Sequence, residues 1–195
     1  TIVDLDELPD LDDAALEARA EPWERPLWLV CTHGTRDRCC AKWGLPLWST
    51  MQALDPEGVW QSAHLGGHRY APVALALPVG LQWGRVELEE VPSLLRAVEA
   101  GDLAALTGLR GRCCYPRAVQ AAEGLLRLEQ GLVAGDALRL LAVREDADAT
   151  EVRFAGPDGV ALTIVVEQVD RPDLAGPASC GDQPTSRQVF RRRHG

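Results

Sequence analysis

The sequence predicts an α/β protein that ends in an antiparallel β extension. Over residues 27–130, apolar runs of strand length alternate with stretches whose apolar residues recur at helical spacing, and from about residue 131 only strand-like runs follow. Strands alternating with helices are typical of α/β folds, whereas consecutive strands separated by turns favour antiparallel pairing. We therefore expect three parts: an acidic N-terminal arm (1–26), an α/β domain (27–130), and a β-rich extension with a basic tail packed on that domain (131–195).

The elements up to residue 130 follow from apolar spacing and from the prolines and glycines that punctuate it. Pro46 suits the first position of a helix, so we expect the helix that carries Leu47, Met51 and Leu54 on one face to begin there. The expected order is a helix over 12–20, a strand over 27–30, a helix from 46 to about 54, strands over 59–63, 71–77 and 81–86, and helices over 92–100 and 116–130.

The C-terminal extension is predicted to be a set of short antiparallel strands. A Gly-Pro-Asp-Gly turn over 156–159 separates the last two of them. From Asp170 onward proline and glycine recur, so the chain from there to its arginine-rich end is expected to be a solvated tail. The three expected strands cover 138–144, 151–154 and 160–166.

Composition restricts the classes of partner. The formal net charge is −9, from 29 acidic and 20 basic side chains, which disfavours nucleic acid and favours basic partners. No run approaches the roughly 18 apolar residues of a membrane span, and the acidic start lacks the basic region of a signal peptide. We expect a cytoplasmic protein with no nucleic acid or membrane partner.

The cysteines also favour a reducing compartment. Six cysteines, four of them in two adjacent pairs, do not resemble a secreted disulfide scaffold, because neighbouring cysteines bridge only with strain. We expect Cys113 and Cys114 to be small buried residues, since free cysteine is among the most buried residue types. Cys180 is expected in a loop, with no evident partner.

The remaining cysteines and most of the histidines gather in two short segments. The first contains Cys31, His33, Cys39 and Cys40, and the second is the pentapeptide His-Leu-Gly-Gly-His over 64–68. Two glycines between the histidines argue against a helix, because each costs about 1 kcal/mol in a helix interior, and favour a loop that lets the backbone approach a ligand closely. Thiolates and imidazoles together suit zinc, copper and iron–sulfur centres.

Spacing alone leaves zinc and an iron–sulfur cluster open. The eight residues between Cys31 and Cys40 are too many for the knuckle of a zinc finger, although other tetrahedral zinc sites remain possible. Two thiolates and two imidazoles also suit the ligand set of a Rieske-type [2Fe–2S] cluster. Cys31-Thr32-His33 is like one Rieske box, but the sequence contains no matching second box.

The two segments together resemble the sucrase/ferredoxin-like family. The resemblance rests on the segment from Cys31 to Ala41 and on the segment from His64 to Pro72, and it extends over roughly residues 27–130. It implies a thioredoxin-like ferredoxin fold that binds a [2Fe–2S] cluster through two cysteines and two histidines. Matched by motif position, the implied ligands are Cys31, Cys40, His64 and His68.

The resemblance also implies how the ligands divide between the two irons. The two cysteines would hold one iron and the two histidines the other, by analogy with ferredoxins that use four cysteines. Cys40 is favoured over Cys39 because its spacing from Cys31 matches the family pattern, which leaves Cys39 as a thiol beside the ligands.

Further residues around the ligands are expected to tune the centre or dock a partner. His33, Arg36 and Arg69 flank the proposed ligands in the sequence. The backbone N–H groups of Gly66 and Gly67 could point at anionic sulfur and stabilise its charge.

The function predicted on this basis is electron transfer to or from a redox partner protein, without an enzymatic reaction, although a redox-enzyme role is not excluded. Imidazole ligands should place the potential above that of plant-type ferredoxins, toward roughly −150 to +300 mV, and reduction should couple to protonation of the histidines. The alternative is a zinc-stabilised interaction module. The oligomeric state does not follow from the sequence.

Overall fold

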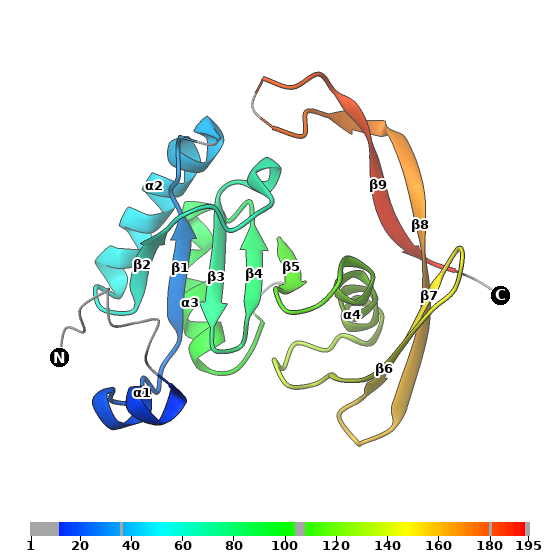
Figure 1. The fold of residues 1–195 in the computed structure, drawn as a ribbon, viewed down its shortest axis with the longest axis horizontal. Coiled ribbons are helices and arrows are strands. Elements are labelled where there is room, and N and C mark those ends of the chain that lie inside the picture. Colours follow the sequence, from blue (N-terminus) through cyan, green and yellow to red (C-terminus); the bar gives the residue numbers. More distant parts are fainter. Residues whose placement is uncertain (1–11, 36, 104–107, 180, 194–195) are drawn as a thin grey trace.

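The computed structural model describes residues 12–35, 37–103, 108–179 and 181–193 as two β-sheets with four α-helices (Figure 1). The elements are α1 (Asp13–Arg19), β1 (Leu27–Cys31), α2 (Arg38–Leu54), β2 (Val59–Ser62), the 3-10 helix η2 (His68–Tyr70), β3 (Val73–Leu77), β4 (Leu81–Gly84), the 3-10 helix η3 (Leu88–Glu90), α3 (Val91–Glu99), β5 (Leu109–Arg112), α4 (Arg117–Gln130), β6 (Arg139–Glu145), β7 (Thr150–Ala155), β8 (Ala161–Gly176) and β9 (Thr185–Arg192).

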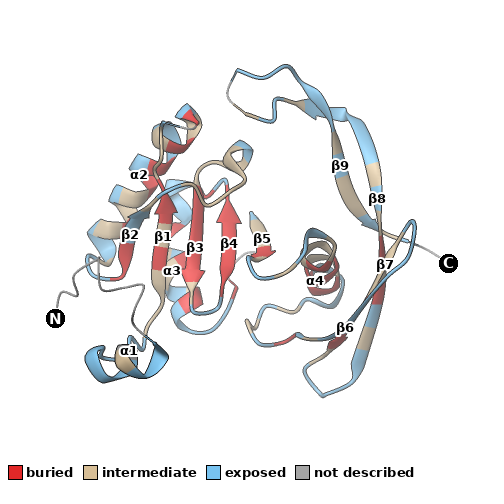
Figure 2. Cartoon of the chain, viewed as in Figure 1, coloured by how far each residue is buried: buried red, intermediate tan, exposed pale blue. Residues whose placement is uncertain are grey.

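The first sheet has the strand order β2-β1-β3-β4-β5. Strands β1 and β2 are parallel and are connected through α2, while every other pair in this sheet is antiparallel. Trp28 and Val30 of β1 pack in one buried cluster with Met51 of α2 and Leu94 of α3. Buried residues accordingly concentrate in β1, β3 and β4 (Figure 2). The predicted α/β unit is confirmed.

Helix α2 begins at Arg38, so the prediction that it begins at Pro46 was wrong. Gly44 and Pro46 both lie inside the helix, although each is unfavourable there. One face of α2 buries Cys40, Leu47 and Met51 against the first sheet. Tertiary packing of this face outweighs the low helix propensity of the two residues, as it commonly does in folded proteins.

The second sheet is an antiparallel meander with the order β6-β7-β8-β9. It packs against α4, where Val119 and Leu126 join Phe154 and Ile164 in a second hydrophobic cluster. The predicted antiparallel C-terminal extension is therefore confirmed, and the apolar side of α4 is buried with it.

Helix α4 also carries a buried ion pair that connects it to β5 of the first sheet. Glu123 Oε1 lies 2.9 Å from Nη2 of Arg127 and 3.4 Å from Nε of Arg112 in β5. Both members of the pair on α4 are almost fully buried, and Arg127 Nη1 donates to the carbonyl of Ala134 at 2.8 Å.

Two sequence predictions about strands were wrong in this part of the fold. Strand β5 was not expected, and its partner β4 was expected to continue to residue 86 but ends at Gly84.

The C-terminal end of the described chain is not the solvated tail that the sequence predicts. Strand β8 continues to Gly176 and pairs with β9 in a long hairpin. Beyond Val166, β8 pairs only with β9, so the hairpin projects past the rest of its sheet and bends back toward the loop between β2 and β3 (Figure 1). Among the described residues, no helix is both long enough and apolar enough to cross a membrane.

Candidate metal centre

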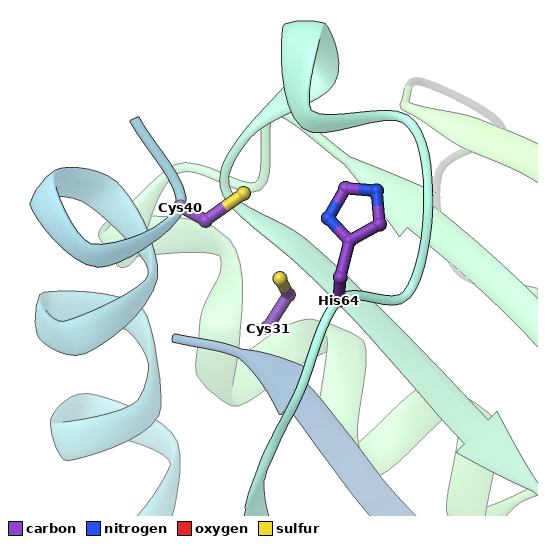
Figure 3. A group of neighbouring side chains, drawn as sticks. All are labelled: Cys31, Cys40 and His64. Atoms are coloured by element: carbon purple, nitrogen blue, oxygen red, sulfur yellow. The ribbon is translucent and has the colours of Figure 1, made fainter. Parts of the chain in front are cut away.

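Two buried thiols meet where β1 and α2 approach each other. Cys31 is the last residue of β1 and Cys40 lies in the first turn of α2. Gly44 allows the approach, because a Cβ at this position would lie only 2.0 Å from the carbonyl oxygen of Cys31. The two sulfur atoms and the ring of His64 face the same space (Figure 3). Their ligand atoms all lie within 4.8 Å of one another, close enough to hold one metal ion.

The two histidines lie on a tight loop that follows β2. Gly66 and Gly67 have φ angles of 81° and 68°, in the left-handed region that side chains disfavour. The loop then enters η2 at His68, and the ring centroids of His64 and His68 are 5.5 Å apart. The predicted loop between the histidines is confirmed, and it brings both imidazoles to the side of the sheet where the thiols lie.

A buried aspartate that the sequence analysis did not single out belongs to the same site. Asp37 Oδ2 lies 3.2 Å from Nδ1 of His68, and the side chain of Asp37 is fully buried. The ligand atoms of Asp37, His64 and His68 form a second group within 4.8 Å of one another. A carboxylate in this position orients an imidazole and raises its basicity as a ligand.

Asp37 could have been found from its position relative to α2. It directly precedes Arg38 and is the N-cap residue of that helix, a position at which aspartate is favoured. The prediction that the helix begins at Pro46 concealed this signal.

The other edge of His68 faces the C-terminal hairpin. Its Nε2 contacts the carbonyl oxygen of Ala178 and lies 3.3 Å from Oγ of Ser179, both in the loop between β8 and β9. Residues more than 100 positions apart in the sequence therefore meet at this imidazole. The C-terminal extension thus covers one side of the candidate centre.

The thiols differ in their surroundings. Burial raises the pKa of Cys40, and the hydrogen bond and negative charge of Cys31 raise it further. Both thiols must lose a proton to ligate a metal, so metal binding at this pair would release protons. Cys39, one position before Cys40 in α2, is half-buried, and its Sγ approaches the carbonyl oxygen of His68 at 3.4 Å.

The remaining predicted residues lie at varying places. His33 is half-buried in the loop between β1 and α2, Arg69 is exposed in η2, and neither belongs to the two ligand groups. Arg36 lies outside the described residues. The guanidinium of Arg110 lies against Gly67. A Cβ added at Gly67 would be 3.0 Å from its central carbon. The tuning roles predicted for these residues stay predictions.

Three cysteines lie away from the centre or outside the described chain. Cys113 and Cys114 are exposed just after β5, so the prediction that they are buried was wrong. Both cysteines lie in the turn between β5, an edge strand, and α4. The packed layers of the fold do not cover this turn. Cys180 lies outside the described residues.

Comparison with known protein families matches residues 3–111 to the sucrase/ferredoxin-like family, which is more than half of the chain. The chain belongs to the sucrase/ferredoxin-like family. No curated protein and no solved structure gave a match. The matched region begins and ends earlier than the 27–130 predicted from the motifs. It includes all four predicted ligands, and it excludes α4 and the second sheet.

Membership of the sucrase/ferredoxin-like family suggests a ferredoxin-like role, and the two side-chain groups show how this chain could hold a metal. The donor set fits, because it combines two soft sulfur atoms with two imidazoles. The two groups share His64, so the four predicted ligands form one continuous cluster with the thiols at one end and His68 at the other.

Proposed function

We propose that this chain is an electron-transfer protein, and not an enzyme, whose [2Fe–2S] cluster is held by Cys31, Cys40, His64 and His68. The observation that carries the proposal is that Cys31, Cys40 and His64 converge on one space. His64 also belongs to the second group, which contains His68. Family membership supports it independently. When bound, such a cluster supplies a one-electron redox couple whose potential the ligands set.

The protein surroundings would influence that couple through charge and solvent exclusion. Cys31 and Cys40 are almost fully buried, which limits water at the sulfur end. At the other end, Oδ2 of Asp37 lies 3.2 Å from Nδ1 of His68 and places a carboxylate beside that ring. We therefore expect the midpoint potential to fall as pH rises through the region where the ligand histidines lose their protons.

The partner that we propose is a redox protein in a reducing compartment, the cytoplasm. None of the five cysteines that the structure describes forms a disulfide, which agrees with such a compartment. The net charge of −9 favours a partner with a basic docking surface over nucleic acid.

A second candidate function is a zinc-stabilised interaction module, and the group of Asp37, His64 and His68 favours it. Two imidazoles and one carboxylate are also ligands that zinc accepts. In that case the metal would hold the loops in place and the protein would have no redox activity.

The deciding experiment is the visible absorption spectrum of the purified full chain before and after dithionite, with iron, sulfide and zinc assayed on the same sample. The proposal expects red-brown bands that bleach on reduction, with about two irons and two sulfides per chain. Colourless protein with one zinc, purified anaerobically from iron-replete cells, would refute the cluster and support the zinc module.

Substitutions assign the ligands. Cys31→Ala should abolish or greatly reduce cluster assembly, whereas His64→Cys or His68→Cys should retain a cluster with a lower potential, because a thiolate adds negative charge. Cys113→Ala is the matched control, since that thiol is exposed and lies outside the ligand groups.

A further inference from the structure

A large cleft lies beside the candidate metal centre. Its volume is about 840 Å³, within the range of small-molecule sites. One wall is the face of the first sheet at β4 and β5, a second is α4, and a third is the β8–β9 hairpin. The loop that carries the two histidines closes one end, and His68 is the only predicted ligand in the lining.

The cleft is positively charged, in contrast to the acidic protein as a whole. Arg69, Arg110 and Arg117 line it, and none of them has a carboxylate within 4.0 Å among the residues that the structure describes. The single acidic residue of the lining is Glu123, and its carboxylate is already paired with Arg127 and Arg112. The three arginines of the cleft are therefore not neutralised from within this part of the chain.

Arg110 is the arginine that the fold holds most firmly. Its Nε donates to Oε1 of Gln82 at 3.3 Å, and its guanidinium lies 4.0 Å above the ring of Tyr70. The same guanidinium packs against Gly67, where an added Cβ would lie 3.0 Å from its central carbon. A half-buried guanidinium held on three sides loses little further entropy when it binds a ligand.

Two arginines of the cleft lie close together at Tyr70. The guanidinium carbons of Arg69 and Arg110 lie 4.9 Å and 4.0 Å from the centroid of its ring. Burial and the charge of Arg69 lower the pKa of Arg110, against the opposing effect of Tyr70. A bound anion would relieve the repulsion between these guanidinium groups.

We propose that this cleft binds a small multivalent oxyanion, an organic molecule with phosphate or carboxylate groups, with Arg110 as the central contact and Arg69 and Arg117 at the rim. The guanidinium fork matches both kinds of oxyanion in a bidentate manner. Enclosure by a sheet, a helix and a hairpin favours a small molecule over an extended macromolecular surface.

A ligand on Arg110 would lie directly next to the histidine loop. Gln82, which accepts the hydrogen bond from Arg110, donates through Nε2 to the carbonyl oxygen of Leu65 at 3.0 Å. Leu65 lies between the two histidines in the sequence. The binding itself requires only the arginines and does not depend on which metal the centre holds.

The test is isothermal titration calorimetry of the purified full chain with pyrophosphate and, separately, with citrate, in buffer of low ionic strength. We expect one site per chain for at least one of the two probes, with affinity that falls as chloride is added. Binding of pyrophosphate alone would identify a phosphate ligand, and binding of citrate alone a carboxylate ligand. Iron and zinc are assayed before and after the titration, so that heat from metal chelation is recognised.

Variants then locate the site. Arg110→Gln should weaken binding about tenfold or more, since hydrogen bonds to charged groups contribute about 1.5–3 kcal/mol. The double variant Arg69→Gln/Arg117→Gln changes only exposed side chains. It tests the same cleft if Arg110→Gln fails to fold, and it should also weaken binding. Arg139→Gln, an exposed arginine on β6 outside the cleft, is the matched control and should bind normally.

Two results would overturn the proposal. One is the absence of saturable binding of either probe up to about 10 mM, a concentration at which even a millimolar site would be occupied. The other is unchanged affinity in both the Arg110 variant and the double variant, which would place the anion elsewhere. Neither result bears on the metal centre, which is judged by its spectrum and metal content.

Discussion

Replacing Gly44 with alanine tests how closely the fold of this protein is tied to its candidate metal centre. Gly44 lies in α2, four residues after Cys40, and its Cα faces the end of β1. An added Cβ would lie 2.0 Å from the carbonyl oxygen of Cys31 and 3.1 Å from its carbonyl carbon. Real contacts of this kind are essentially never shorter than 3.0 Å, so the helix and the strand would have to separate by about 1 Å.

Two opposing effects set the change in the free energy of unfolding of Gly44→Ala. Alanine improves helix propensity by about 1 kcal/mol over glycine. Overpacking against rigid backbone costs about 3 kcal/mol, at the upper end of what buried sites show. We therefore expect Gly44→Ala to lower the free energy of unfolding by about 2 kcal/mol. The same separation moves Cys40 away from Cys31 by far more than the ~0.2 Å tolerance of metal–ligand distances, so metal content should fall sharply.

The matched control is Gly124→Ala in α4, where an added Cβ would meet no atom within 4 Å. This variant should gain about 0.5–1 kcal/mol and keep its metal. Urea unfolding followed by circular dichroism measures stability, and elemental analysis measures metal. If Gly44→Ala is as stable as Gly124→Ala and holds as much metal, the close approach of α2 and β1 has been misjudged.

Three further predictions concern single side chains. Cys39→Ala should keep nearly all of the metal and Cys40→Ala should lose it, as measured by elemental analysis; the reverse pattern would exchange their assignments. Asp37→Asn should raise the midpoint potential in a redox titration, because it removes a negative charge beside His68, and an unchanged potential would argue against a role for this carboxylate. Glu123→Gln should lower the free energy of unfolding, measured in urea, by about 3–5 kcal/mol, because it leaves the buried guanidinium of Arg127 without its counter-charge. A loss below about 1 kcal/mol would show that the carbonyl partners of Arg127 are enough to stabilise it.

The sequence was most informative where a pattern is local. The apolar run before Cys31 predicts β1, and the glycine pair between His64 and His68 predicts a loop. Both depend on the conformational preferences of a few consecutive residues, which act in the same way in any surroundings. The residue types of the two segments also sufficed to predict a metal centre and a family, and the family is confirmed.

Errors arose where packing overrides local preference. Gly44 and Pro46 are unfavourable in helices, yet α2 runs through both because the face that carries Gly44, Leu47 and Met51 is buried against the sheet. The start of this helix at Arg38 makes Asp37 an N-cap residue, so an error in one boundary concealed a residue of the site. The prolines and glycines after Asp170 likewise suggested a tail, whereas cross-strand pairing with β9 makes the segment a strand.

By itself, then, the amino-acid order determined the fold class, the two motifs and the candidate ligand residues, because these follow from residue type and short-range periodicity. Only the tertiary structure decided which donors meet, that Asp37 joins them, and that the β8–β9 hairpin reaches His68. Contacts between residues as far apart as His68 and Ala178 depend on strand register and on the packing of separate elements. No local pattern encodes those quantities, since they result from the simultaneous burial of apolar faces across the whole chain.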